Sequence, residues 1–265
     1  GDAAVADVFA GTGRDHKATV EKIGKTLKPQ SFATGKTFTI KNKTEHHPDG
    51  IGTNVIGVLE GADPALKEEM IILGGHLDHL GYCYELMPGA NDNASSVAVL
   101  LGIAEAMAKC PIKPPRSVMF LFFGAEEQGV AGSEFYVDHP AFPLEKTAAL
   151  LNLDGVGCGD RIHILAGENF PELEAFIEKA NARYIHRQAH SSFFSNIARP
   201  RLDAARFLWK NVPSLSFSVS GAPSFYHTTK DALETITPEI LEDLAQLLFA
   251  AVLDMSDEPT LNFRK

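Results

Sequence analysis

The 265-residue sequence predicts an α/β protein with a central sheet of mostly parallel strands and helices on both faces. Three short apolar runs support this prediction, over residues 70–74, 117–123 and 148–153. They lack the alternation of a half-exposed strand, which is typical of central strands covered on both faces. Helical patterns follow or separate the runs, and strands that alternate with helices favour a parallel sheet.

The residues before the first apolar run form a weaker pattern. Residues 1–15 suggest irregular structure, whereas Val20, Ile23 and Leu27 indicate a helix near 16–27. Residues 37–42 alternate like a strand with one exposed face, and 54–59 is a second candidate strand.

Three later segments carry helical periodicity. Residues 94–109 place apolar side chains on one stripe at 3.6 residues per turn, and 171–183 repeat the pattern. The last helix begins at Thr237-Pro238, a capping residue followed by proline at the first helical position.

Composition restricts the partners and the location. The formal net charge of −10 argues against a nucleic-acid partner, which favours a basic face. No apolar run approaches the roughly 20 residues that span a bilayer, so no membrane span is expected. The N-terminus, GDAAVADVFAG, lacks the basic start and apolar stretch of a secretory signal, which a mature or trimmed chain would also lack.

The cysteines do not predict a metal site. There are three, Cys83, Cys110 and Cys158, with no CxxC spacing, and they are too few for a disulfide framework. We expect free or buried thiols, and one disulfide stays open.

Charged and ligating residues follow each of the three apolar strands. His76 and Asp78 follow the first, Glu126 and Glu127 the second, and Asp154 the third. In an open α/β sheet, the carboxyl ends of such strands lie at the edge where ligands bind.

Two further segments add candidate ligands. Asp92 lies in GANDN, just before the helix at 94–109, and His227 lies in the loop sequence FYHTTKD. Imidazoles and carboxylates together suit zinc or a similar divalent ion, and one carboxylate can bridge two metals. Because gathered carboxylates repel one another without cations, the sequence favours a metal cluster.

Five segments in order resemble the family 28 metallopeptidases, the two-zinc exopeptidases that include bacterial leucyl aminopeptidases and glutamate carboxypeptidase. The segments are GGHLDHLG, PGANDNASSVAVLL, FLFFGAEEQGVAGSEFYV, LNLDGVG and FYHTTKD. The resemblance covers about residues 50–255. It implies a zinc-exopeptidase (phosphorylase/hydrolase-like) fold with a twisted mixed sheet. We therefore expect a single zinc-peptidase domain over 1–265, with an N-terminal helix and edge strand in 1–45 and a catalytic core over 50–255.

The resemblance also implies a ligand set for two Zn²⁺ ions per chain, although cobalt or manganese also suits such ligands. His76 and Asp154 would bind one zinc, Glu127 and His227 would bind the other, and Asp92 would bridge them.

Three further roles follow from the resemblance. Glu126 would be the general base that takes a proton from the metal-bridging water and delivers it to the leaving amine. Asp78 would orient His76 by accepting its other ring N–H. The peptide bond between Asp92 and Asn93 would be cis.

Three residues near these motifs have less defined roles. The Tyr226 hydroxyl would stabilise the developing oxyanion, or its ring would pack beside the metals. His79 lies either beside the ligands or at the rim of the site. Around Asp203 the string RLDAA departs from the Ser-Asp-His that relatives often carry, so no role is assigned to this residue.

The leading function is that of an aminopeptidase acting on the free amino end of a peptide substrate. One alternative is a glutamate-releasing carboxypeptidase, which needs cationic groups for the terminal carboxylate, and Arg199, Arg201 and Arg206 are available. Another is a glutaminyl cyclase with one zinc, and a third is a receptor-like domain without activity. The resemblance alone suggests a periplasmic or secreted location, and nothing predicts the oligomeric state.

Overall fold

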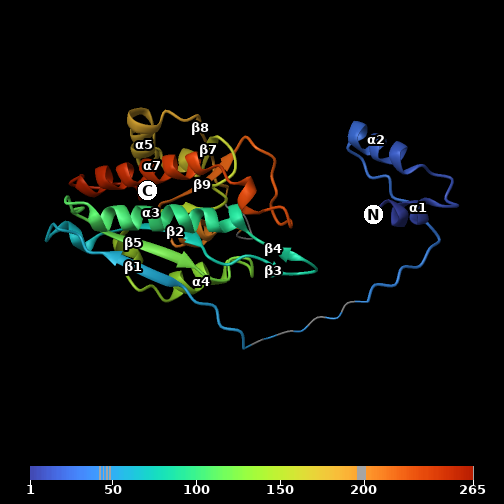
Figure 1. Ribbon diagram of the computed structural model, residues 1–265, viewed down its shortest axis with the longest axis horizontal. Helices are drawn as coiled ribbons and strands as arrows, with labels where there is room; N and C mark the ends of the chain where they lie inside the picture. The colour runs from blue at the N-terminus through green and yellow to red at the C-terminus, as the bar shows by residue number, and fades with distance from the viewer. Residues whose placement is uncertain (42, 44, 46, 48, 196–200, 265) are drawn as a thin grey trace. The chain divides into compact units, whose positions relative to one another are not determined.

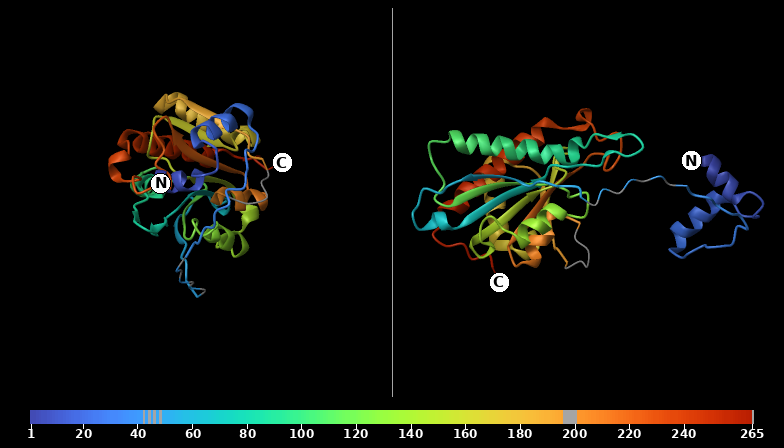
Figure 2. Two further views of the ribbon diagram at one scale, coloured as in Figure 1. Left: turned by 90° about the vertical axis from the view of Figure 1, so that its right-hand side faces the viewer. Right: turned by 90° about the horizontal axis from the view of Figure 1, so that it is seen from below.

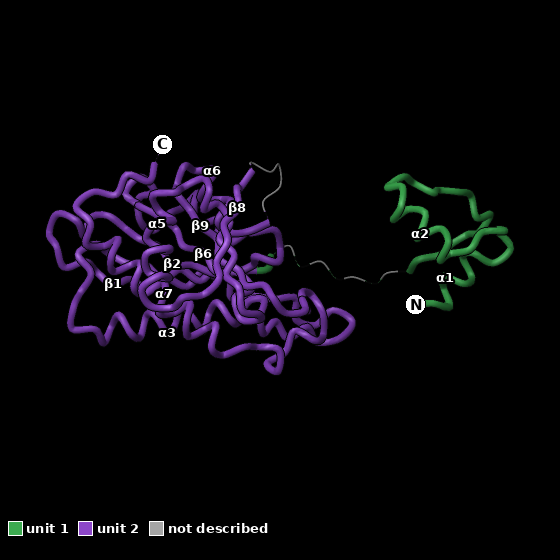
Figure 3. Tube along the Cα trace, turned by 90° about the horizontal axis from the view of Figure 1, so that it is seen from above, with its two compact units in different colours: residues 1–50 green, residues 51–265 purple. Residues whose placement is uncertain are grey.

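The computed structural model describes residues 1–41, 43, 45, 47, 49–195 and 201–264. The chain divides into two compact units, Gly1–Gly50 and Ile51–Lys265, which Figure 3 shows in different colours. The first unit contains helices α1 (Asp2–Phe9) and α2 (His16–Thr26). The Asp15 carboxylate caps α2 by accepting the backbone N–H of Ala18 at 2.7 Å.

The first unit corrects two predictions and confirms one. Helix α2 confirms the helix expected near 16–27. The expectation of irregular structure over 1–15 is wrong for residues 2–9, because the alanine-rich segment of α1 is a good helix former. Residues 37–41 contain no strand, and residue 42 lies outside the described residues. Alternation alone does not make a strand, since a strand is stabilised by pairing with its neighbours.

The second unit is built on a seven-stranded sheet with the order β1-β5-β2-β6-β9-β7-β8 (Figure 1). Its strands are β1 (Val55–Leu59), β2 (Met70–His76), β5 (Ser117–Phe123), β6 (Thr147–Leu153), β7 (Arg161–Leu165), β8 (Ala189–Ser192) and β9 (Ser214–Ser220). A small hairpin joins β3 (Gly81–Tyr82) and β4 (Leu86–Met87).

The sheet is mixed and mostly parallel, as predicted. Strands β5, β2, β6 and β9 are parallel neighbours, and β8 is parallel to β7. Within this seven-stranded sheet, as described, the antiparallel pairs are β1 with β5 and β7 with β9. The central strands were predicted from all-apolar runs, and β7, β8 and β9, which contain polar residues, were not predicted for that reason.

Helices cover both faces of this sheet (Figure 2). They are α3 (Ser95–Lys109), α4 (Ala131–Asp138), α5 (Pro171–Ala180), α6 (Asp203–Trp209) and α7 (Pro238–Asp257). Short helical turns connect the elements, namely η1 (Leu66–Glu68), η2 (Ala90–Ala94), η3 (Leu144–Lys146), η4 (Gly167–Asn169), η5 (Asn181–Ile185) and η6 (Leu233–Thr235).

Strand β2 shows why the central strands are apolar throughout. Ile71 and Leu73 pack into a buried cluster with α3, α5 and α7, whereas Met70 and Ile72 pack into a second cluster with α4 and α6. Successive side chains of a strand point to opposite faces, so a strand between two helical layers is apolar at every position.

Two further expectations concern single features of the described residues. No helix among them is long and apolar enough to cross a membrane. All three cysteines lie among them and are free thiols, so the disulfide that the sequence left open is not formed.

Candidate metal centre

The parallel order of β2, β5 and β6 brings three ligating segments to one edge of the sheet. His76 is the last residue of β2, is 1% exposed, and lies in register with Phe123 at the end of β5. Glu126 and Glu127 follow β5 directly, and Asp154 follows β6. Their convergence results from topology, because parallel neighbours end at the same edge.

A first group of ligand atoms forms around His76. Its Nε2 lies 3.2 Å from Oδ1 of Asp92 and 3.7 Å from Oδ1 of Asp154. The ligand atoms of these three residues all lie within 4.8 Å of one another, which is close enough to share one cation.

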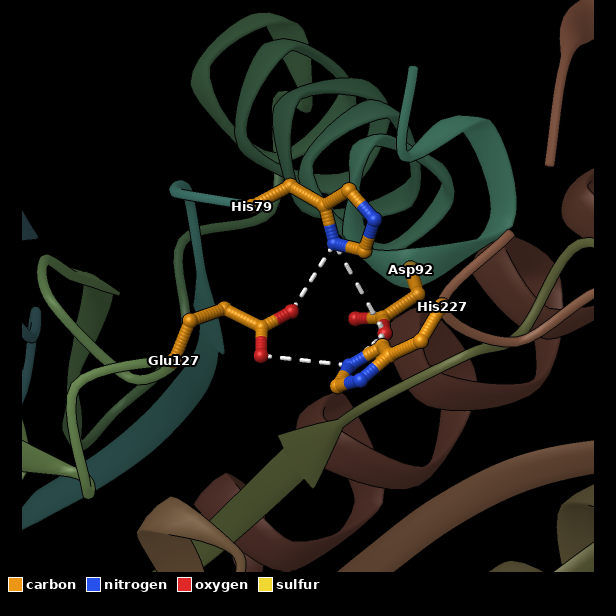
Figure 4. A group of neighbouring side chains, drawn as sticks. All are labelled: His79, Asp92, Glu127 and His227. Carbon is orange, nitrogen blue, oxygen red and sulfur yellow. Dashed lines mark ion pairs between the residues drawn. The ribbon is translucent and has the colours of Figure 1, made fainter. Parts of the chain in front are cut away.

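A second group, drawn in Figure 4, also contains Asp92. Nε2 of His227 lies 3.3 Å from Oδ2 of Asp92 and 3.1 Å from Oε2 of Glu127. His79 joins this group, with its Nδ1 2.8 Å from Oε1 of Glu127. The two oxygens of Asp92 therefore face different groups, which is the arrangement of a bridging carboxylate.

The donor atoms of the second group fit a divalent cation. Several buried atoms there have no hydrogen-bond partner within the described part of the chain: both ring nitrogens of His79, Oδ2 of Asp92, Oε1 of Glu127 and Nε2 of His227. Buried polar atoms without partners are costly in folded proteins, so their clustering needs an explanation. A bound cation such as zinc, which accepts imidazole and carboxylate ligands, supplies it.

Hydrogen bonds attach the loop that carries Asp92 to the end of β6. The peptide bond between Asp92 and Asn93 is cis, as the resemblance implied. The side chain of Asn93 donates to the carbonyl of Leu153 at 3.1 Å and accepts the N–H of Gly155 at 3.1 Å. These two bonds span Asp154, so Asn93 fixes the separation of two ligands that belong to the first group.

Asp231 is a site residue to which sequence reasoning assigned no role. Its carboxylate accepts the backbone N–H of Asn91 at 2.8 Å and that of Asp92 at 3.0 Å. Its carbonyl accepts the N–H of Ala90 at 3.0 Å. Asp231 thus joins the loop of Asp92 to the loop of His227, and its place in FYHTTKD was the available signal.

The structure corrects the expected contact of Asp78. Nδ1 of His76 lies 3.0 Å from the backbone carbonyl of Asp78, to which it donates, and 3.8 Å from the carboxylate. The carboxylate instead accepts the N–H groups of Glu126 and Glu127, at 3.0 and 3.2 Å. Asp78 therefore orients His76 through its main chain and the two glutamates through its side chain.

Charge interactions change the proton affinity of His76. Burial alone lowers the pKa of an imidazole, but hydrogen bonds with the carboxylates of Asp154 and Asp92 outweigh burial and raise the pKa of His76 to about 12. Without a cation, the imidazole is therefore protonated at neutral pH and partly neutralises the carboxylates around it.

The pKa of Glu126 is also raised, but for a carboxyl group this favours the neutral form. Burial raises the pKa of Glu126 to about 8, the charge of His76 opposes this shift, and the carboxylates of Asp203 and Asp154 add to it. Asp203, at the first position of α6, is 1% exposed, and burial raises its pKa to about 7. The RLDAA segment therefore reaches the surroundings of the site, although its sequence departs from that of relatives.

Tyr226 lies beside the second group. Its ring stacks on the imidazole of His227, with centroids 3.7 Å apart and planes at 18°. Partial burial, together with the charges of Asp92 and Glu127, raises the pKa of Tyr226 to about 12. The hydroxyl thus stays protonated near neutral pH and is available as a hydrogen-bond donor.

The sequence profile of peptidase family M28 matches residues 54–252, about three quarters of the chain. The chain belongs to this family. The match covers the seven-stranded sheet and every residue of both ligand groups. It does not include the first compact unit, Gly1–Gly50.

Two proteins with similar sequences are an aminopeptidase and a leupeptin-inactivating enzyme. The chain is 27% identical over 242 residues to aminopeptidase YwaD of Bacillus subtilis, covering 87% of this chain and 49% of that one. It is 32% identical over 144 residues to leupeptin-inactivating enzyme 1 of Streptomyces exfoliatus, covering 54% of this chain and 30% of that one. The chain thus spans half or less of the length of these relatives.

Solved structures of the same fold include two aminopeptidases. That from Aneurinibacillus sp. strain AM-1 has a TM-score of 0.67 and 27% identity, covering 80% of this chain and 50% of that one. The zinc aminopeptidase BSAP of Bacillus subtilis has a TM-score of 0.62 and 25% identity, covering 76% and 49%. The glutaminyl cyclase of Porphyromonas gingivalis, at 18% identity and a TM-score of 0.64 over 78% and 80%, shares the fold.

Replacing Asp231 by Asn tests the connection between the two loops. Asn keeps one acceptor oxygen and turns an NH₂ group toward a backbone N–H, so one hydrogen bond is lost. We expect metal affinity to fall about 10–100-fold, as for other residues that hold ligands in place. Competition with a chromophoric chelator measures this, with Asp138→Asn on the surface of α4 as the control. Equal affinities in the two variants would contradict the role of Asp231.

The raised pKa of His76 predicts proton release when the metal binds. A ligating imidazole must be neutral, so at neutral pH the cation displaces the proton that His76 carries in the metal-free protein. We expect about one proton or more released per chain. Because the folded pKa is raised, affinity should weaken steadily as the pH falls from alkaline to acid. A pH indicator in weakly buffered solution measures the release; uptake of zinc without it would show that His76 is neutral or unligated.

Proposed function

We propose that this chain is a two-zinc aminopeptidase that hydrolyses the N-terminal peptide bond of its substrate. The observation that carries the proposal is the carboxylate of Asp92, whose two oxygens face two separate groups of ligand atoms. His76 and Asp154 would hold one zinc, Glu127 and His227 would hold the other, and Asp92 would bridge them. Bound in such a pair, divalent cations polarise a carbonyl and make water a stronger acid.

Glu126 is the residue that moves the proton. Its side chain is half-buried beside the first group, and its backbone N–H donates to the carboxylate of Asp78 at 3.0 Å. Positive charge in the site lowers the raised pKa of Glu126, so the group is ionised when the site is loaded. An Oε atom then accepts a proton from the attacking water and passes it to the nitrogen of the leaving amine.

Tyr226 supplies a hydrogen bond in this proposal. The stacking of its ring on His227 restricts the ring, and its protonated hydroxyl can donate to a carbonyl oxygen as negative charge develops there. The side chain is still 61% exposed, which leaves it accessible to a substrate that enters from solvent.

The charges around the site favour binding of the amino end of a peptide substrate over binding of its carboxyl end. A substrate ammonium group is attracted by the surrounding carboxylates, whereas a terminal carboxylate needs a cationic clamp. Arg206 is an ion-pair partner of Glu134 at 2.9 Å and lies over the ring of Trp209. Arg201 is exposed, and Arg199 lies outside the described residues.

A substrate panel tests the reaction. The purified chain would be assayed with zinc and with a chelator against aminoacyl amides, the same compounds N-blocked, and a C-terminal glutamate peptide. Hydrolysis of the free amines alone, abolished by chelator and restored by zinc, is expected. Cleavage of the blocked peptide from its carboxyl end would favour the carboxypeptidase. Cyclisation of an N-terminal glutamine, with one zinc per chain, would favour the glutaminyl cyclase.

Replacing Glu126 by Gln removes the proton acceptor and nearly preserves the volume of the side chain. We expect kcat to fall about 10²–10⁴-fold, the usual contribution of general acid–base catalysis. The zinc content should not change, since the metal ligands are intact. The control is Glu105→Gln, an exposed position on α3 that pairs with Lys109. Full activity of the Glu126 variant would assign the proton transfer to another residue.

A further inference from the structure

We propose that His79 is a fourth protein ligand in the second group, so that the two metal sites differ in ligand number and in affinity. This inference rests on the proposed two-metal centre and deepens it. The family resemblance assigns Asp92, Glu127 and His227 to this site and leaves His79 without a role. In the structure, His79 follows β2 by three residues and turns into the same cluster (Figure 4).

The four side chains lie about as far apart as the ligands of one tetrahedral zinc, within about 0.5 Å. Zinc bonds of about 2.0–2.2 Å to nitrogen and oxygen place tetrahedral ligands about 3.3–3.6 Å apart. Nδ1 of His79 lies 2.8 Å from Oε1 of Glu127 and 3.7 Å from Oδ2 of Asp92. The two contacts of His227 are 3.1 and 3.3 Å. His79 thus lies as near to its neighbours as the ligands that the resemblance assigns.

The contact between His79 and Glu127 is not an ordinary hydrogen bond. Their nearest atoms are 2.8 Å apart, yet neither His79 Nδ1 nor Glu127 Oε1 has a hydrogen-bond partner within the described residues. An Nδ1 atom without a proton and a carboxylate oxygen repel each other at this distance unless a positive charge lies between them. Shared coordination of one cation accounts for both the distance and the missing hydrogen bond.

The neighbourhood of His79 is shaped to hold its ring. The side chain is 8% exposed, and the ring meets that of His227 edge to face, with centroids 5.6 Å apart. At Gly89, whose φ is +69°, a Cβ would lie 2.5 Å from Cγ of His79, so any other residue there would displace the ring. Such close packing of backbone against the ring is not expected for a histidine at the rim of the site.

The two sites are then unequal. The second group offers four protein ligands, the number typical of tightly held structural zinc, whereas the first offers His76, Asp92 and Asp154. Three protein ligands leave a position open. Asp78, whose carbonyl lies 3.0 Å from Nδ1 of His76, also accepts the backbone N–H of Glu126 at 3.0 Å and so holds Glu126 beside this group. We therefore assign the tighter binding to the group that contains His79, and the exchangeable position to the group beside Glu126.

Metal titration of two variants tests the assignment. His79→Phe keeps an aromatic ring against Gly89 without a donor atom, and His79→Gln keeps polarity with a smaller side chain. His139→Gln, at an exposed position after α4, is the matched control. Metal-free proteins would first be compared by circular dichroism, and then titrated with zinc against a chromophoric chelator and with cobalt by visible absorption.

The wild type should bind zinc in two resolved steps. In both His79 variants we expect the tighter step to weaken at least tenfold while the weaker step is kept. The absorption of the first cobalt equivalent should also change, because one nitrogen ligand is lost. Unchanged binding steps in a folded variant would overturn the proposal. Weakened binding with an unchanged cobalt spectrum would overturn ligation too, since His79 would then act only through Glu127.

These results are separable from those that test the proposed function. A wild-type chain that binds no divalent ion would end both proposals, and one that binds two ions without hydrolysing peptides would end only the aminopeptidase. A wild type that binds two ions and cleaves aminoacyl amides, beside His79 variants with the same two affinities, would end only the inference about His79.

Discussion

The gathering of carboxylates at one edge of the sheet is the constraint on which the rest of this structure depends. Buried negative charges repel, and a folded state that contains them needs counter-charge. In the protein itself, His76 supplies part of it, as the direction of its pKa shift shows. The remaining unpartnered atoms of the described residues, centred on Asp92 and Glu127, fit a bound divalent cation as the source of the rest. The folded arrangement of these carboxylates and the binding of a cation therefore depend on each other.

Hydrogen bonds from residues that are not ligands hold the ligand-bearing segments at this edge of the sheet. Asp231 holds the loop of Asp92, Asn93 attaches that loop to the end of β6, and Asp78 fixes the backbone of the glutamates. These three residues are not assigned as ligands, but their hydrogen bonds set the distances between ligands that come from different segments. A rigid sheet edge with hydrogen-bonded loops is the means by which a fold holds a metal pair in place.

Family membership and the geometry of the ligand groups together favour metal-dependent peptidase chemistry for this chain. The sequence matches peptidase family M28 over the sheet-bearing unit, and it covers about half of two named aminopeptidases. The family resemblance assigns no role to two residues of the site region, His79 in the second group and the buried Asp203 near Glu126. Of the two, His79 carries a prediction that the resemblance alone does not make.

The sequence by itself determined the central strands, the long helices, and the segments that carry ligands. Unbroken apolar runs specify strands covered on both faces, and short polar motifs after them specify a binding edge. The strand expected over residues 37–42 is absent from 37–41, and β7, β8 and β9 were not predicted, because pairing with neighbours decides these segments. Tertiary structure alone placed His79 beside Glu127, gave Asp231 its two backbone N–H groups, and turned the carboxylate of Asp78 to the glutamates. Such contacts join residues tens of positions apart, and no local pattern encodes their distance or direction.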